Sequence, residues 1–193
     1  MTKAAFLVIL MLFALSGDKN GTPSNDTFSE MPELVQACDY FEVYSTTPGE
    51  YKYYIYNLDG ELVYENNASI PVIYMVDDDL IWIEHGVGTA TTQVRFFSLS
   101  KNELSDWYDT PRGAGYGLVA YMTYEDGAEH TPVLQIKDIF DEEPTWTFKR
   151  DFSPVANLGG ILSDVEFISS TQVQATYLLG ENYTETIEII YLK

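Results

Sequence analysis

The sequence predicts an all-β fold built from antiparallel hairpin units. Three observations support this class. Tyr (15) and Phe (10) are abundant among the 193 residues, which favours strands over helices. From Asp39 onward, apolar runs of strand length alternate with short polar turns. No stretch after Cys38 keeps a helical period, so strands remain as the way to bury the apolar residues.

The first hairpin is the most clearly marked. The aromatic and β-branched run Tyr51–Tyr56 leads into Asn57-Leu58-Asp59-Gly60 and returns as Glu61–Tyr64. Asp-Gly between two such runs is typical of a hairpin turn. The same criteria predict strands over Pro71–Val76, Leu80–Glu84, Gln93–Leu99, Leu104–Tyr108, Gly117–Tyr124, Pro132–Lys137, Thr145–Lys149, Asp164–Ile168, Gln172–Leu178 and Glu185–Leu192.

The turns recur at a constant distance. Their central apolar residues are Leu58, Leu99, Ile139 and Leu179, about 40 residues apart, a spacing typical of β-propeller blades. We therefore expect either a small four-unit β-propeller or, alternatively, a β-sandwich or barrel. In a closed propeller, these four residues would be buried between neighbouring sheets. The segment from Asp39 would then lie beside the one ending at Leu192.

The N-terminus has the pattern of an export signal. Lys3 is followed by an apolar run from Ala4 to Leu15, too short to span a bilayer comfortably, and then by small residues. We interpret residues 1–16 as a signal peptide and the polar residues 17–29 as a flexible tether. The predicted location is therefore secreted or at the cell surface.

The end of this signal resembles a bacterial lipoprotein signal in Leu15-Ser16-Gly17. The position that would carry the lipidated cysteine is Asp18, and a carboxylate cannot form the thioether. The resemblance implies a membrane attachment only through a tether, and only if lipidation occurs.

Residues 30–193 are predicted to form a single all-β domain with a short N-terminal helix over Glu30–Cys38. Met31, Leu34, Val35 and Cys38 follow helical spacing, and Thr27 with Glu30 matches a capping box. Cys38 is the only cysteine, so no internal disulfide can form, and we expect its thiol to be buried and inert.

The charge excludes some partners. Ten basic residues against 30 acidic ones give a formal net charge of −20. Such a field repels nucleic acid and anionic lipid surfaces, and it attracts cations such as Ca²⁺ or a basic protein.

Aromatic side chains are the main candidates for ligand binding. Tyr53 and Tyr54 are adjacent and must face opposite sides of a strand, so one face presents rings to solvent, which suits a glycan or a protein ligand. The candidate ligand-binding residues are Trp82, Trp107, Trp146, Tyr54 and Tyr116.

Asp77, Asp78 and Asp79 are the candidate metal ligands, and Ca²⁺ is the only cofactor that the sequence suggests. We interpret this run mainly as a solvated turn, because the spacing of a calcium loop is absent.

No catalytic motif is found: the serine nucleophile elbow and the zinc-protease motif are both missing. The sequence thus favours a non-catalytic, secreted or surface-tethered acidic β protein that binds a ligand. The alternative is a small secreted hydrolase that acts on glycans through a carboxylate pair.

Overall fold

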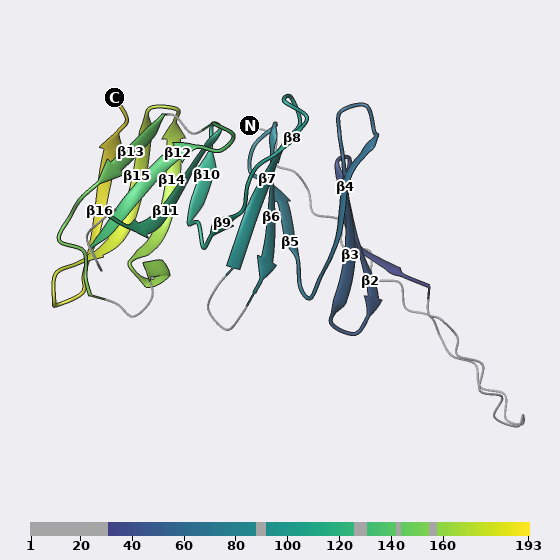
Figure 1. Ribbon diagram of the computed structural model, residues 1–193, viewed down its shortest axis with the longest axis horizontal. Coiled ribbons are helices and arrows are strands. Elements are labelled where there is room, and N and C mark those ends of the chain that lie inside the picture. Colours follow the sequence, from purple (N-terminus) through teal and green to yellow (C-terminus); the bar gives the residue numbers. More distant parts are fainter. Residues whose placement is uncertain (1–30, 88–91, 126–130, 142–143, 155–157) are drawn as a thin grey trace, which may run out of the picture.

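A computed structural model describes residues 31–87, 92–125, 131–141, 144–154 and 158–193 (Figure 1). The predicted signal peptide, tether and capping box lie outside the described residues. The described chain is all-β, as predicted, and every strand pair is antiparallel. No helix in the described part is long and apolar enough to cross a membrane.

The strands form four open sheets, which we name A to D in chain order. Sheet A contains β1 (Glu33–Cys38), β2 (Phe41–Thr47), β3 (Glu50–Tyr56) and β4 (Leu62–Ala68). Sheet B contains β5 (Val72–Met75), β6 (Leu80–Gly86), β7 (Thr92–Ser98) and β8 (Glu103–Leu104), and β9 (Tyr108–Asp109) also pairs with β7. Sheet C contains β10 (Gly113–Gly115), β11 (Leu118–Tyr124), β12 (Pro132–Asp138) and β13 (Thr145–Phe148). Sheet D contains β14 (Leu162–Ser169), β15 (Gln172–Leu179) and β16 (Thr184–Tyr191), and a 3-10 turn, η1 (Leu158–Gly160), precedes it.

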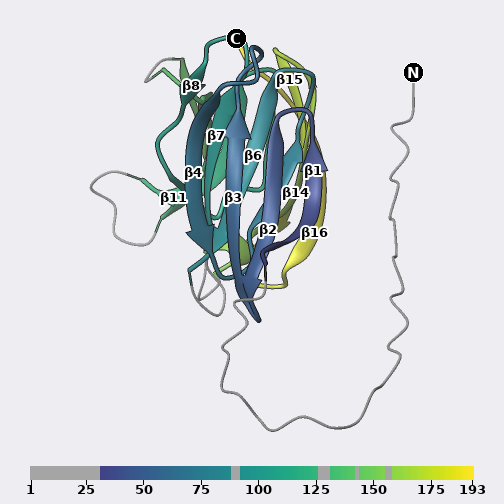
Figure 2. The ribbon, with the colours of Figure 1, turned by 90° about the vertical axis from the view of Figure 1, so that its right-hand side faces the viewer.

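The sheets are layered face to face, and each packs on the next in the chain (Figures 1 and 2). Three apolar clusters hold the layers together. Sheets A and B bury residues such as Tyr53 and Ile83, and sheets B and C bury residues such as Phe96 and Val119. Sheets C and D bury the largest cluster, which includes Tyr177. Sheets A and D share none of these clusters and lie at opposite ends of the molecule in Figure 1. The arrangement is consistent with a β-sandwich or an open, propeller-like stack.

The repeat of about 40 residues is visible in the strands themselves. The third strand of successive units begins at residues 50, 92, 132 and 172, and the fourth at residues 62, 103, 145 and 184. In the last unit, the described chain before β14 contains η1 and Phe152, which forms an isolated bridge to Leu179 of β15. The hairpin units therefore follow the predicted period, and sheet D has one strand fewer.

The expected burial of the four turn residues is only partly correct. Leu99 and Ile139 are buried and Leu179 is half-buried, but Leu58 is 60% exposed. Leu99 and Ile139 are each the first residue after the third strand of their unit, and in sheet A that position is held by Asn57. Asn57 is buried because its Oδ1 accepts the backbone N–H groups of the turn, which leaves the following leucine outside. A closed ring would also bring sheets A and D together, and among the described residues these two sheets share no apolar cluster.

The predicted N-terminal helix is a strand. Its residues from Glu33 onward form β1, which pairs with β2 and is anchored by a 2.8 Å hydrogen bond from Gln36 Nε2 to the carbonyl of Ile73. A helix of nine residues is marginal without packing partners, whereas pairing with β2 satisfies backbone groups at once. Leu34 and Val35, assigned to a buried helical face, are about half exposed.

Cys38 is exposed, which corrects the expectation of a buried thiol. It ends β1 at the edge of sheet A, and its sulfur accepts a hydrogen bond from the backbone N–H of Tyr40 at 3.4 Å. The helical spacing predicted a buried position, but the segment is a strand, so that spacing does not determine which residues are buried.

Candidate functional site

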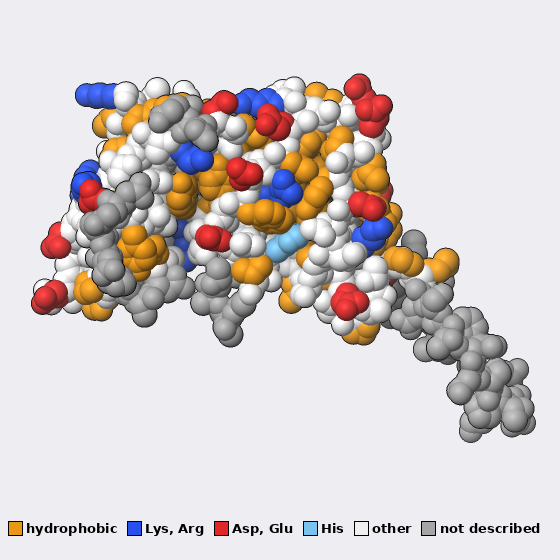
Figure 3. All heavy atoms as spheres, viewed as in Figure 1, with side chains coloured by type: hydrophobic (Ala, Val, Ile, Leu, Met, Phe, Trp, Pro, Cys, Tyr) orange, Lys and Arg blue, Asp and Glu red, His pale blue; other side chains and the backbone are white. Residues whose placement is uncertain are grey.

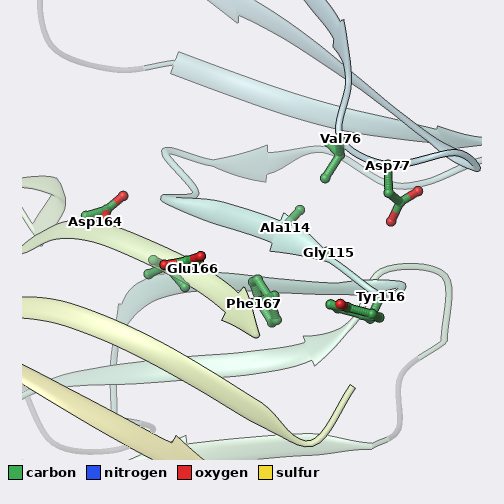
Figure 4. Close-up of a pocket in the computed structure, with 9 residues that line it drawn as sticks. Val76, Asp77, Ala114, Gly115, Tyr116, Asp164, Glu166 and Phe167 are labelled. Atoms are coloured by element: carbon green, nitrogen blue, oxygen red, sulfur yellow. The ribbon is translucent and has the colours of Figure 1, made fainter. Parts of the chain in front are cut away.

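A cleft of about 570 Å³ lies where sheets B, C and D meet, and we call it the acidic cleft (Figure 4). Its walls come from the end of β5, from β10 with the turn that follows, and from β14. The lining residues are Val76, Asp77, Ala114, Gly115, Tyr116, Asp164, Val165, Glu166 and Phe167.

Two glycines of β10 allow sheets C and D to approach each other at this cleft. A Cβ at Gly113 would lie 2.6 Å from the carbonyl oxygen of Val165, and one at Gly115 would lie 3.0 Å from Cβ of Phe167. Any larger residue would force β10 away from β14. The position of β14 as a wall of the cleft therefore depends on glycine in the facing strand.

Tyr116 is held at the rim by a tight turn. Tyr116 and Gly117 both have positive φ, 55° and 76°, as two-residue hairpin turns require, and they join β10 to β11. The ring is 56% exposed, and its hydroxyl donates to the carbonyl of Ile168 at 3.2 Å. The turn thus presents a flat aromatic surface next to the acids of the cleft.

The charged side chains of the cleft are acidic. Asp77 lies on one side, and Asp164 and Glu166 project from β14 on the other (Figure 4). Asp164 and Glu166 are two residues apart on one strand, so they share a face. Among the described residues that line the cleft, none is Lys or Arg.

A second cleft of about 340 Å³ adjoins the first through Asp77 and Tyr116. It adds Asp79 and Asp138 to the acidic surface, with Lys101 as a basic neighbour. Burial opposes ionisation of Asp79, but hydrogen bonds from Ser98 and Ser100 outweigh it and keep the pKa of this carboxyl below its usual value. Asp79 is therefore a fixed negative charge at neutral pH.

Two residues of the aspartate run bond to the chain around them. Asp77 Oδ1 accepts the N–H groups of Asp79 and Leu80, both at 2.9 Å, and Asp79 binds Ser98 and Ser100 on β7 and its turn. The oxygens of these two side chains thus hold the turn together. Across the described residues, Asp77, Asp78 and Asp79 included, no three acidic, histidine or cysteine side chains converge in a way that could hold a metal ion.

The five aromatic candidates are not brought together. Trp82 is buried between sheets B and C, stacked on Tyr74 at 5.6 Å, and its indole N–H donates to Glu84. Trp146 packs at the edge of the C–D core, with its N–H bound to the carbonyl of Lys193. The indole N–H groups of both tryptophans are therefore engaged within the chain.

Tyr54 does face outward, as its alternation with the buried Tyr53 predicts. It lies on the outer face of sheet A, beneath the ammonium of Lys52 at 5.0 Å and edge-on to Tyr44. No residue of sheet A is among the described residues that line the acidic cleft. Of the five candidates, only Tyr116 lines the cleft.

Trp107 belongs to a separate cluster at the end of the A–B core. Its ring lies 5.1 Å from the guanidinium of Arg95 and 5.0 Å from the ring of His85. A second aromatic ring, that of Tyr64, has its centre 5.1 Å from the same guanidinium. Figure 3 shows a basic group and a histidine among hydrophobic side chains on this face of the molecule.

His85 and Tyr53 connect this cluster to the core. The His85 ring nitrogen Nε2 and the Tyr53 hydroxyl are 2.7 Å apart. Burial, together with the charge of Arg95, lowers the pKa of His85, and burial raises the pKa of Tyr53. Both groups are therefore neutral at physiological pH.

Sequence reasoning missed Asp164 and Glu166. Their i, i+2 spacing on a predicted strand does indicate a shared face, but 30 acids offer many such pairs. The selection of this pair depends on β14 lying against β10 and the β5–β6 turn, which is a tertiary contact.

No protein-family model matches the chain, and no curated protein matches its sequence.

Proposed function

We propose that this chain is a non-catalytic, exported or surface-tethered binding protein whose acidic cleft takes a cationic ligand, most simply a Lys- or Arg-rich segment of another protein. The observation that carries the proposal is the acidic lining of the cleft. Its described residues place carboxylates on two walls and the exposed Tyr116 at the rim, and they include no basic side chain.

The chemistry of recognition follows from this lining. Carboxylates accept charge-assisted hydrogen bonds from ammonium and guanidinium groups, and an exposed tyrosine ring attracts a cation to its face. The net charge of −20 adds a long-range field that raises the rate of encounter with a basic partner. A cleft of about 570 Å³ is large enough for more than one side chain.

The test is a calorimetric titration with a Lys/Arg-rich peptide and with a Glu-rich peptide of equal length. The basic peptide should bind, more weakly as salt is added, and the acidic peptide should not. Asp164→Asn combined with Glu166→Gln should weaken binding at least about tenfold. The matched control is Asp59→Asn with Glu103→Gln, which makes the same change of charge at exposed positions outside the cleft.

Equal losses in the two double variants would mean that only net charge matters, and would contradict a site in the cleft. Binding of the acidic peptide as strongly as the basic one would contradict the charge argument altogether.

A glycan hydrolase is the alternative, because Asp77 lies on one side of the cleft and Asp164 and Glu166 lie on the other (Figure 4). Hydrolysis needs two carboxylates, one of them a general acid with a raised pKa. Among the described residues, the carboxyls with a shifted pKa are Asp79 and Glu188, and in both the pKa is lowered instead. Release of reducing sugar from a glycan panel, lost in Asp77→Asn and in Glu166→Gln, would favour the enzyme over the binding protein.

A further inference from the structure

Strand β16 is an exposed sheet edge that differs from the other edges of the molecule. The edges formed by β5, β8, β9, β10 and β13 contain four residues or fewer. The edges formed by β1, β4 and β14 are longer, but a register shift interrupts the pairing of each. β16 has eight residues and pairs with β15 without any shift. Short strands and bulges are devices by which proteins block edge-to-edge association, and β16 has neither.

The side chains of β16 also suit association. Every second residue in this part of β16 lies on the outer face of sheet D. These residues are Ile187, Ile189 and Tyr191, and they are 64%, 46% and 63% exposed. The strand contains no proline and no lysine, the residues that commonly protect an edge. In both ribbon views, β16 lies at the periphery of the described part (Figures 1 and 2).

The direction of the backbone groups follows from one hydrogen bond. The N–H of Leu192 donates to the carbonyl of Thr171, on the side of β15. Main-chain groups alternate sides along an antiparallel strand, so those of Ile187, Ile189 and Tyr191 point to the free side. These are the same three residues that expose apolar side chains.

We propose that β16 pairs in antiparallel fashion with β16 of a second copy of this chain, about a two-fold axis at Ile189. In this register Ile189 faces itself, and Ile187 faces Tyr191 of the second copy. Each of these pairs can exchange two main-chain hydrogen bonds. The two D sheets then form one continuous sheet across an isologous interface.

Charge selects this register over its neighbour. Pairing about Ile189 places Glu185 opposite Lys193 of the second copy, an attractive pair at each end. Pairing about Glu188 would instead place two glutamates directly opposite each other, which is unfavourable. Self-association must still overcome a net charge of −20 on each copy, so added salt should strengthen the dimer.

Engineered disulfides test both the dimer and its register, with the whole chain in a Cys38→Ser background to remove the exposed native thiol. Ile189→Cys should form an intermolecular disulfide under mild oxidation, because facing residues have Cα atoms within bonding range. The matched control is Ile187→Cys. Its thiol faces Tyr191 of the second copy, and the equivalent thiol of that copy lies too far along the strand to bond with it. It should remain reduced. Equal oxidation of both variants, or of neither, would overturn the register.

Sedimentation velocity tests the association without any disulfide. The unmodified chain should shift from monomer to dimer as protein and salt concentrations rise, and Ile189→Lys should abolish the shift. The control is Leu62→Lys, which adds the same charge at an exposed residue of the β4 edge and should leave the dimer intact. A chain that stays monomeric at several hundred micromolar in high salt, or that dimerises equally with Ile189→Lys, would overturn the proposal. The proposal would also be overturned if β16 paired with unrelated proteins but not with a second copy of this chain.

Discussion

Gly113 on β10 touches the backbone of Val165 on β14, and no other residue type fits between them: an added Cβ would come within 2.6 Å of the Val165 carbonyl oxygen. This contact sets the distance between sheets C and D at the acidic cleft.

The first prediction concerns this contact. Gly113→Ala should destabilise the protein by about 1–3 kcal/mol, the usual cost of overpacking a site whose neighbour is backbone. Urea unfolding measures the change. Gly86→Ala is the control, since a Cβ there meets nothing within 4 Å, and it should have little effect. If both variants were equally stable, the close approach of β10 to β14 would not exist in solution.

The second prediction compares two turn residues that the sequence treats as equivalent. Ile139 is 3% exposed between sheets B and C, and Ile139→Ala should cost about 2–5 kcal/mol. Leu58 is 60% exposed, and Leu58→Ala should change the free energy of unfolding by no more than about 0.5 kcal/mol. Chemical denaturation of the two variants checks the difference. Similar costs would mean that the turn of sheet A is buried after all.

The third prediction is a pH dependence that originates at His85. Its pKa is lowered in the folded protein by burial and by Arg95, so the unfolded chain binds a proton at this side chain more readily. Stability should therefore fall as the pH drops from above about 6.5, the unfolded value, through the folded pKa, and the loss from this group should then level off.

The variant His85→Gln tests this assignment, because glutamine can still bond the Tyr53 hydroxyl but does not titrate. Free energies of unfolding at about pH 7.5 and about pH 5.5 should differ less in the variant than in the unmodified protein. The same difference in both proteins would place the pH dependence elsewhere.

The fourth prediction concerns export. If residues 1–16 are a signal peptide, exported protein should begin near Gly17, as intact mass would show. Asp18→Cys restores the residue that a lipoprotein signal requires, and in a bacterial host it should convert a released product into a membrane-anchored one. Asp18→Ser is the control and should stay released. Exported protein that keeps Met1 to Leu15 would contradict the signal peptide.

Local patterns were sufficient for most of the fold. The hairpin at Asn57–Gly60 and strands such as Gln172–Leu178 follow from alternation and turn residues, which act over a few positions. The period of about 40 residues also follows from the chain itself. The error at Glu33–Cys38 arose where a short helical period competed with pairing to β2, a partner that the local sequence does not reveal.

The candidate site was less predictable, because it is assembled from three sheets. Tyr116 and Asp77 were identified by residue type alone, while Asp164 and Glu166 were not. Trp82 illustrates the converse: an aromatic residue that appears available for binding is buried when another sheet packs on its strand. Which face of a strand is covered depends on the order of the layers, and that order is set by contacts between distant segments.

The layered order has a consequence for how the molecule opens. Sheet A shares a core only with sheet B, and sheet D only with sheet C, while B and C each have two neighbours. Detaching an end sheet therefore breaks one interface, whereas detaching an inner sheet breaks two. Amide protons of β2 and β3 should thus exchange with solvent through a partial opening that leaves Tyr177 and its surroundings intact. The chain would respond to mild denaturant as a series of linked layers that separate from the ends inward.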